Sequence, residues 1–151
     1  MKIALIAVGR ARRDPSAALF EHYLGRIRST IEVREIPEAK GNTAAERMER
    51  EAKAILAAVP KGAHVVALDP RGKTLTSEAF AAHIRKLGDE ARAVAFLIGG
   101  ADGFADEVRA KADLVLSFGA MTWPHLMVRA MLAEQIYRAE TILAGHPYHR
   151  P

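Results

Sequence analysis

The sequence of 151 residues contains no cysteine, and this absence excludes several kinds of site. Disulfide frameworks, thiolate metal sites and cysteine nucleophiles all need a residue that the chain does not have. Long hydrophobic runs are missing as well, since the opening apolar stretch reaches charged residues directly after Gly9, too early to cross a bilayer. That stretch also lacks the order of a secretory signal. We therefore expect a cytoplasmic protein with no membrane segment.

Internal repeats, linkers and low-complexity segments are absent too, and what remains is an ordinary globular composition. Half of the residues are hydrophobic, 26% are charged and the formal net charge is +4. A chain of this length fits a single domain, residues 1–151, with a substantial hydrophobic core. The positive charge is compatible with a polyanionic partner such as RNA, but it does not by itself establish one.

Segments with strand and helix signals alternate along the whole chain. Apolar or alternating runs predict strands at 2–8, 31–36, 64–68, 93–98 and, more weakly, 114–117, with 31–36 at a sheet edge. Capping residues and helical spacing predict helices at 14–28, 43–59, 76–88 and 124–143, with a short turn at 105–111. This alternation predicts the α/β class, with a mostly parallel sheet flanked by helices.

Four loops are expected to meet at one rim of this sheet, because ligands of open α/β sheets bind beyond the carboxyl ends of the strands. The loops are 9–13, 69–73, 99–103 and 119–125. Glycines in them let the backbone approach a flat ligand closely, and their cationic side chains suit a phosphate-bearing substrate. The residues predicted to hold phosphates are Arg10, Arg12, Arg13, Arg71 and Lys73.

Two of these loops leave alternatives open. The glycines of 99–103 could admit an adenine or a ribose, or they could form an ordinary tight turn between a strand and a helix. The loop is neither a Walker loop nor the dinucleotide fingerprint, which disfavours an NAD enzyme. Met121 and Trp123 could likewise pack against a cofactor ring or simply cap the core.

The helix predicted at 124–143 is apolar over an unusually wide arc. Val128, Leu132 and Ile136 mark one face, and Met127 and Tyr137 extend it sideways. A helix that is apolar on more than one side must be buried on more than one side. It is therefore either a central core helix or part of a subunit interface, and we expect a homodimer.

The segment His146-Pro147-Tyr148-His149-Arg150 concentrates two imidazoles, a phenol and a guanidinium near the end of the chain. Chain ends usually fray and carry little chemistry. Pro147 prevents a helical presentation of the two histidines and no acidic ligand lies nearby in the sequence, so we expect no metal site. A tyrosine with charged donors suits an RNA base and its phosphate better.

Together these motifs resemble those of the RlmH family, SPOUT-class enzymes that methylate N3 of a pseudouridine in 23S ribosomal RNA. The matching motifs are Leu68-Asp69, the glycine-bearing segment 97–103, the segment 122–138 that opens with Thr122-x-Pro124-His125, and the tail 146–150. The resemblance covers essentially the whole chain. It implies a trefoil knot near the C-terminus, S-adenosylmethionine as the cofactor, the ribosome as the partner, and a homodimer in which the tail closes over a cofactor pocket.

The resemblance also implies roles for individual residues. The cofactor contacts fall at Leu68, Gly100, Gly119, Ala120, Met121, Thr122, Trp123 and Pro124. The N3 proton must leave, so a base or a cation that stabilises the ring anion is needed. His149 and Arg150 are the first candidates, with Tyr148 stacking or donating, while His125 and Arg129 are second choices that would otherwise bind RNA.

Two features stay open at this point. The family often has glutamate where this chain has Asp102, which keeps the charge without a defined role. A non-catalytic RNA-binding or ribosome-binding module is the alternative function, and it would need the basic rim but no cofactor pocket.

Overall fold

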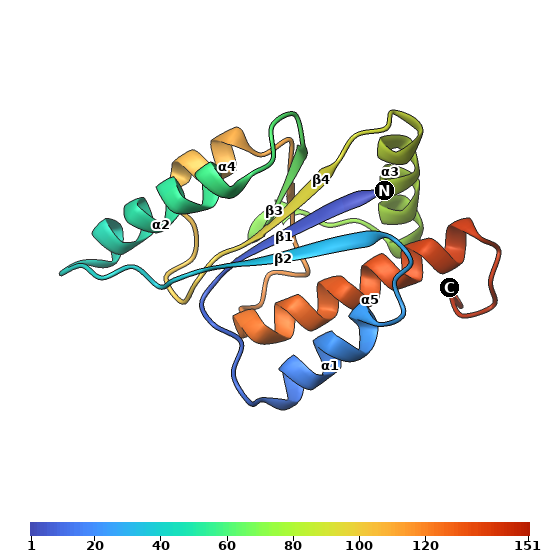
Figure 1. The fold of residues 1–151 in the computed structure, drawn as a ribbon, viewed down its shortest axis with the longest axis horizontal. Coiled ribbons are helices and arrows are strands. Elements are labelled where there is room, and N and C mark those ends of the chain that lie inside the picture. Colours follow the sequence, from blue (N-terminus) through green and yellow to red (C-terminus); the bar gives the residue numbers. More distant parts are fainter.

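A computed structural model describes residues 1–151 and shows a five-stranded sheet with helices on both faces (Figure 1). The strands are β1 (Lys2–Val8), β2 (Thr30–Ile36), β3 (His64–Lys73), β4 (Val94–Ile98) and β5 (Leu114–Leu116). They lie in the order β2-β1-β4-β3-β5, and every pairing is parallel. The predicted α/β class with a parallel sheet is therefore confirmed.

The helices are α1 (Pro15–Leu24), α2 (Ala44–Ala58), α3 (Ser77–Asp89), α4 (Asp106–Lys111) and α5 (His125–Leu143). Three of the five helices begin where the sequence places a capping side chain, whereas α4 and α5 have no side-chain cap bond. The side chains of Asp14, Thr43 and Thr76 accept hydrogen bonds from backbone N–H groups in the first turns of α1, α2 and α3. These bonds satisfy donors that a helix start leaves without partners.

Two boundaries differ from the prediction. Helix α1 ends at Leu24 rather than near residue 28, because the backbone N–H groups of Arg28 and Ser29 donate to the carboxylate of Glu140 instead of to helix carbonyls. Strand β3 runs beyond Leu68 to Lys73, since both of these residues pair with Leu116 of β5 across a register shift. Both the early end of α1 and the longer β3 depend on partners that are remote in sequence.

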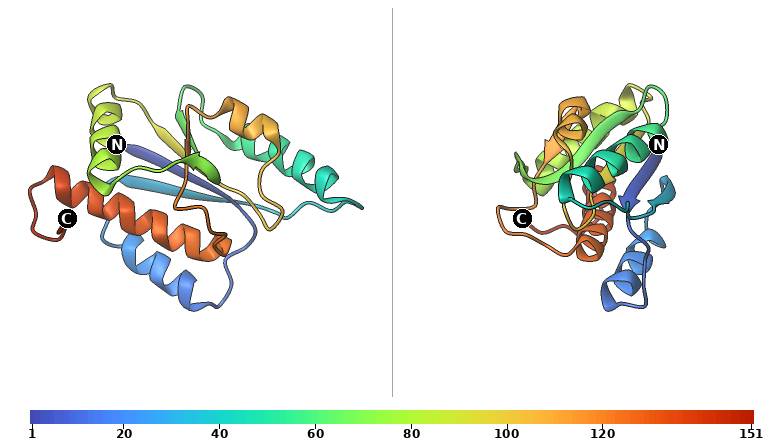
Figure 2. Two further views of the ribbon diagram at one scale, coloured as in Figure 1. Left: turned by 180° about the vertical axis from the view of Figure 1, so that it is seen from behind. Right: turned by 90° about the vertical axis from the view of Figure 1, so that its left-hand side faces the viewer.

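The core consists of two hydrophobic layers, one on each face of the sheet. Helices α1, α3 and α5 cover one face, where Leu5 and Phe96 pack with Ile136, and α2 and α4 cover the other, where Ile6 and Leu97 pack with residues such as Ile55 (Figures 1 and 2). Successive residues of a strand point to opposite faces, so a central strand with both faces covered is apolar throughout.

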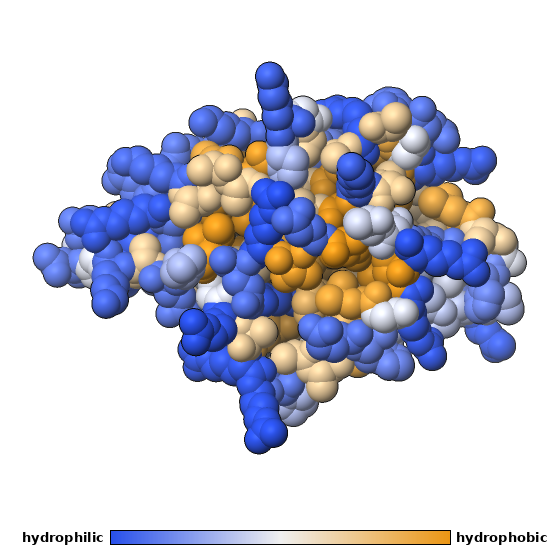
Figure 3. All heavy atoms as spheres, viewed as in Figure 1, coloured by the Kyte–Doolittle hydropathy of each residue, from blue (hydrophilic) through white to orange (hydrophobic).

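Strand β2 lies at the edge of the sheet, as its alternating pattern predicts, and its residues are half-buried or exposed. On the face that Figure 3 shows, charged and polar side chains surround hydrophobic ones that gather near the middle. None of the helices combines the length and the apolar character that a membrane crossing would need.

Candidate functional site

A cavity of about 610 Å³ opens at the carboxyl ends of β3 and β4. Its walls come from three loops that the sequence analysis singled out, and the lining residues are 68–70, 98–104, 122–125 and Val128. This is the edge at which open α/β sheets bind their ligands. The cavity is therefore the first candidate for a cofactor site.

The glycine loop after β4 forms one wall and is shaped by its own backbone. Gly103 has a φ of +82°, and its N–H donates to the carbonyl oxygen of Gly100 at 3.0 Å. A Cβ on Gly100 would lie 2.9 Å from Cγ1 of Val8, which is too close. Glycine is thus needed at position 100 because Val8 of β1 packs against it. The backbone of Gly100 therefore lines the cavity without a side chain.

Asp102 is fixed at the end of this wall by an arginine of α2. Its Oδ2 lies 3.0 Å from Nε of Arg47 and its Oδ1 lies 3.5 Å from Nη2, while Nη1 of Arg47 donates to the carbonyl oxygen of Gly41 at 3.1 Å. The hydrogen bond to Asp102 raises the pKa of the Arg47 guanidinium. Asp102, which the resemblance left without a role, braces the glycine loop against α2.

The wall formed by residues 68–70 contains a second carboxylate that is held in a similar way. Asp69 is 8% exposed, and its oxygens accept from the backbone N–H of Arg71 at 2.9 Å and from Nη1 of Arg109 at 3.2 Å. Asp69 and Asp102 are the charged side chains that line this cavity. Each is partly neutralised by its arginine, and together they favour a ligand that carries positive charge.

The third wall depends on a close approach between two segments. The hydroxyl oxygen of Ser117 lies 3.1 Å from the carbonyl oxygen of Pro70 and 3.0 Å from the amide nitrogen of Gly119. A Cβ on Gly72 would lie 2.5 Å from the carbonyl oxygen of Val115, so only glycine fits there. Residues 115–119 thus pack directly against β3, and the chain that follows them places Thr122 at the cavity.

The residues predicted to contact a cofactor fall into two groups. Leu68, Gly100, Thr122, Trp123 and Pro124 line the cavity. Gly119, Ala120 and Met121 are not among its lining residues, and Met121 is 74% exposed. The structure thus brings the first group together around one cavity. The cofactor contacts of both groups stay predictions.

The basic residues predicted to hold phosphates lie around this site. Arg10 and Arg12 line a neighbouring cavity of about 390 Å³ with Glu35 and Glu38. Arg71 lines another of about 420 Å³, and Arg13 and Lys73 are exposed. All of these side chains can reach solvent, as phosphate contacts require.

His125 lies between the candidate cofactor cavity and the cavity that contains Arg10. His125 lines the candidate cofactor cavity. A Cβ placed on Gly9 would lie 3.5 Å from Nε2 of His125 and 3.5 Å from Oε1 of Glu38, so the imidazole also lies close to the second cavity. A substrate that reached from one cavity to the other would pass this imidazole. The position is consistent with the predicted RNA contact of His125.

Arg129 lies in the interior and not on the surface that RNA would approach. It is 2% exposed, its Nη1 lies 2.7 Å from Oε2 of Glu35, and its Nη2 donates to the carbonyl oxygen of Gly9 at 2.9 Å. The hydrogen bond from Arg129 lowers the pKa of Glu35 more than any other interaction does. Glu35 also accepts from the backbone N–H of Ala11 at 2.6 Å. Arg129 therefore holds the loop that presents Arg10.

The tail folds back onto the C-terminal half of α5. The hydroxyl of Tyr148 donates to Oε1 of Glu134 at 3.1 Å, and His149 lies between Nη1 of Arg138 at 3.0 Å and Oε1 of Glu78 at 2.9 Å. Burial, followed by hydrogen bonding, raises the pKa of Tyr148, so its phenol stays protonated and can donate but cannot serve as a base at neutral pH.

Within one chain, the tail and the candidate cofactor cavity lie at opposite ends of α5. The cavity includes His125, the first residue of this 19-residue helix, and the tail follows its last turn. A helix of that length spans about 28 Å, and the tail folds back only as far as Glu134, about 14 Å along the axis from His125. The structure therefore does not bring Tyr148, His149 or the exposed Arg150 together with the predicted cofactor contacts of the same chain.

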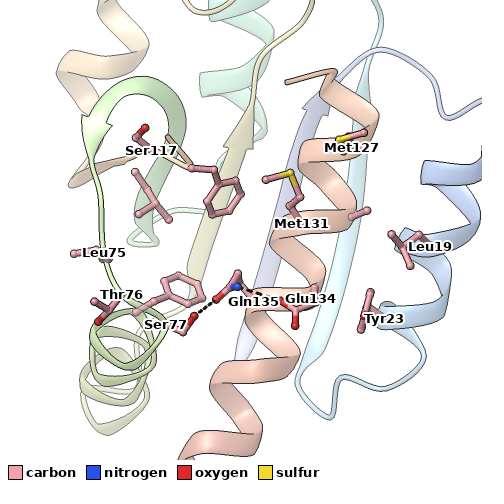
Figure 4. Close-up of a pocket in the computed structure, with 14 residues that line it drawn as sticks. Leu19, Tyr23, Leu75, Thr76, Ser77, Ser117, Met127, Met131, Glu134 and Gln135 are labelled. Carbon is pink, nitrogen blue, oxygen red and sulfur yellow. Dashed lines mark hydrogen bonds between the residues drawn. The ribbon is translucent and has the colours of Figure 1, made fainter. Parts of the chain in front are cut away.

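A second, largely apolar cavity of about 440 Å³ lies between α1, α3 and α5. Figure 4 shows Leu19 and Tyr23 of α1 on one side of α5 and Met131 directed to the other side, where Ser77 of α3 is bonded to Gln135 at 2.8 Å. The wide apolar arc of α5 predicted that this helix is buried on more than one side. Part of that apolar surface lines this groove and is left uncovered in the single chain. No group of three His, Asp or Glu side chains in the chain could hold a metal ion.

Comparison with known proteins identifies several relatives. A family described as predicted SPOUT methyltransferase matches residues 1–149. The protein named ribosomal RNA large subunit methyltransferase H from Rhodospirillum centenum is 57% identical, with 99% of each chain covered. The protein of the same name from Paramagnetospirillum magneticum is 49% identical over the full length of both.

Solved structures share the fold at low sequence identity. A probable methyltransferase from Bordetella pertussis Tohama I has a TM-score of 0.60 at 14% identity, covering 91% of this chain and 95% of that one. A Legionella pneumophila methyltransferase solved with bound SAM has a TM-score of 0.53 at 16% identity, covering 92% of this chain and 66% of that one.

Proposed function

This chain belongs to the SPOUT methyltransferase family, and from that premise we propose that it transfers the methyl group of S-adenosylmethionine to large-subunit ribosomal RNA. The observation that carries the proposal is the cavity lined by Leu68, Gly100 and the segment 122–124. A non-catalytic RNA-binding module would need only the basic rim. Ribosomal RNA as a substrate also implies a cytoplasmic location.

The residues of the cavity fit this cofactor. The backbone of the glycine loop and the side chain of Trp123 would hold its adenosine, and the carboxylates of Asp69 and Asp102 suit its positive charge. When bound, the cofactor supplies an electrophilic methyl group. Transfer is an in-line displacement, so the protein contributes mainly by orienting the acceptor.

We further propose N3 of a pseudouridine in 23S ribosomal RNA, within the ribosome, as the acceptor. Its proton must be removed or the ring anion stabilised, and His149 and Arg150 are the candidates for these tasks. Tyr148 would donate a hydrogen bond, since its raised pKa keeps it protonated. Arg10, Arg12, Arg13, Arg71 and Lys73 would contact phosphates around the cavity.

Because the tail and the cavity of one chain are far apart, the proposal requires a homodimer in which the tail of one subunit serves the cavity of the other. The apolar groove between α1 and α5 is the proposed interface (Figure 4). We also propose a C-terminal trefoil knot, supported by the close passage of residues 115–119 against 70–73.

The dimer can be tested through Met127, which lines the groove and is 37% exposed. Met127→Glu should leave the monomer folded, and it should weaken association by several kcal/mol, to order of magnitude, because the carboxylate would be buried without a partner. Light scattering at micromolar concentration measures the mass. Met121→Glu, at a position that is 74% exposed, is the control. A wild-type monomer would contradict the proposal.

Cofactor binding can be followed through Trp123, the single tryptophan of the chain. It lines the cavity and is 40% exposed, so S-adenosylmethionine should change its fluorescence. Calorimetry should show that Trp123→Ala lowers the affinity about tenfold, because aromatic contacts contribute about 1 kcal/mol or more. Methyl transfer to ribosomes then tests the reaction. A wild-type protein that neither binds the cofactor nor methylates ribosomes would refute the proposed function.

A further inference from the structure

The three tyrosines of the chain form one cluster along α1, α5 and the tail. The ring centroids of Tyr23 and Tyr137 are 6.2 Å apart, and those of Tyr137 and Tyr148 are 4.7 Å apart. The guanidinium of Arg26 lies over the ring of Tyr137, 5.6 Å from its centroid. The packing of the two other rings fixes Tyr137, and Tyr137 in turn positions the guanidinium.

A cavity of about 250 Å³ opens beside this cluster. Arg26, Arg28, Tyr137 and His146 are among its lining residues. Both arginines are exposed, and neither guanidinium forms an ion pair with any carboxylate of the chain. Two guanidinium groups and an aromatic ring therefore line one small cavity, and neither guanidinium has a carboxylate partner in the chain.

The acidic group at this cavity is already engaged elsewhere. The carboxylate of Glu140 accepts from the backbone N–H groups of Arg28 at 2.8 Å and Ser29 at 3.0 Å, and from the hydroxyl of Ser29 at 2.7 Å. Carbonyl groups at the end of α5 accept from the N–H groups of Gly145 and His146. These bonds hold the Glu140 carboxylate against the backbone but leave its charge in place, so the two arginines give the cavity one net positive charge.

We propose that this surface is a second RNA site, which binds a single-stranded segment with a base stacked against Arg26 and a phosphate bonded to Arg28. Flat guanidinium and aromatic surfaces stack on unpaired bases, and arginine forks bind phosphate oxygens. The inference rests on the proposed function, which supplies RNA as the partner. Within one chain, Tyr137 and Glu140 of this surface lie about 18 and 22 Å along α5 from His125. In the proposed homodimer the surface adjoins the tail that serves the partner's cavity, so it contacts RNA that flanks the methylated base.

The test compares two double variants with the wild-type protein. Arg26→Ala/Arg28→Ala removes two charges from the site, and Lys61→Ala/Lys111→Ala removes two exposed charges from the side of the sheet that α2 and α4 cover. The probe is a fluorescently labelled single-stranded uridine oligonucleotide of about 12 nucleotides. Its affinity is measured by anisotropy at several salt concentrations.

We expect the arginine double variant to bind about tenfold more weakly or worse, with the slope of log affinity against log salt reduced by about 0.7, which corresponds to the one phosphate contact of Arg28. The lysine variant should change little. Arg26→Lys should bind several-fold more weakly, because the charge stays and the planar surface is lost. Affinity for S-adenosylmethionine should be unchanged in all variants.

Wild-type affinity and slope in the arginine double variant would overturn this site. If that result accompanied normal methylation of ribosomes by the wild-type protein, the proposed function would stand and only the second site would fall. Equal losses in the arginine and lysine variants would also overturn it, because they would show that net charge and not this surface binds the RNA.

Discussion

Glu35→Ala should destabilise the protein more than Arg129→Met does, although Arg129 is the buried partner of the pair. The guanidinium of Arg129 is 2% exposed, and Glu35 is its only counter-charge. Removing Glu35 leaves an uncompensated buried charge, at a cost of about 3 kcal/mol, the low end for such sites. The low end applies because the Glu35 side chain is 37% exposed, so water can replace it.

Arg129→Met removes the buried charge together with its hydrogen bonds. It leaves the carbonyl oxygen of Gly9 without its donor, but the carboxylate of Glu35 can be solvated and keeps its bond from Ala11. Urea unfolding should therefore give the order wild type, Arg129→Met, Glu35→Ala in decreasing stability. Adding Arg129→Met to Glu35→Ala should restore part of the loss. A double variant less stable than Glu35→Ala would contradict the account.

The same pair should give a pH dependence of known sign. Arg129 lowers the pKa of Glu35 in the folded state. The stability that Glu35 contributes is therefore complete above the ordinary carboxyl pKa and is lost as the pH falls through the lowered one. The difference in unfolding free energy between the wild type and Glu35→Ala should shrink over that acidic range. A constant difference would mean that the charge of Glu35 is not what stabilises the protein.

Most helices and strands could be predicted from the sequence because their signals depend on residues that are close together in the chain. A cap such as Thr43 bonds within its own helix turn, and an apolar run such as β1 is needed by any strand covered on both faces. The end of α1 could not be predicted in the same way. It depends on Glu140, which is 112 residues from Arg28 in sequence.

The candidate cofactor cavity could be placed in advance because the carboxyl ends of parallel strands meet at one edge. The position of Arg129 could not be read from its residue type, since arginine is rarely buried. A signal was present in its spacing: Arg129, Leu132 and Ile136 lie three and four residues apart, on the buried face of α5. The contacts of the tail with Glu134 and Glu78 could not be predicted, because the residues after the helix show no periodicity.

Ending the chain after His146 should lower methyl transfer by about a hundredfold or more, the usual effect of losing a catalytic base or cation. The cut keeps the N–H groups of Gly145 and His146, which donate to the carbonyl oxygens of Ile142 and Thr141 at the end of α5. It removes the partners of Glu134 and Glu78, but the pair of Arg138 with Glu134 at 2.6 Å remains. The truncated protein should therefore fold and bind S-adenosylmethionine.

Single-turnover rates with saturating cofactor and ribosomes measure the loss, and Arg150→Ala should reproduce most of it because a cation near the ring stabilises its developing negative charge. Glu78→Gln is the matched control: it removes the charge of the carboxylate beside His149 without shortening the tail, so it should reduce the rate much less. The wild-type rate in a folded, truncated protein would show that the tail is dispensable. The base would then have to lie beside the cavity, where His125 is the imidazole already in place.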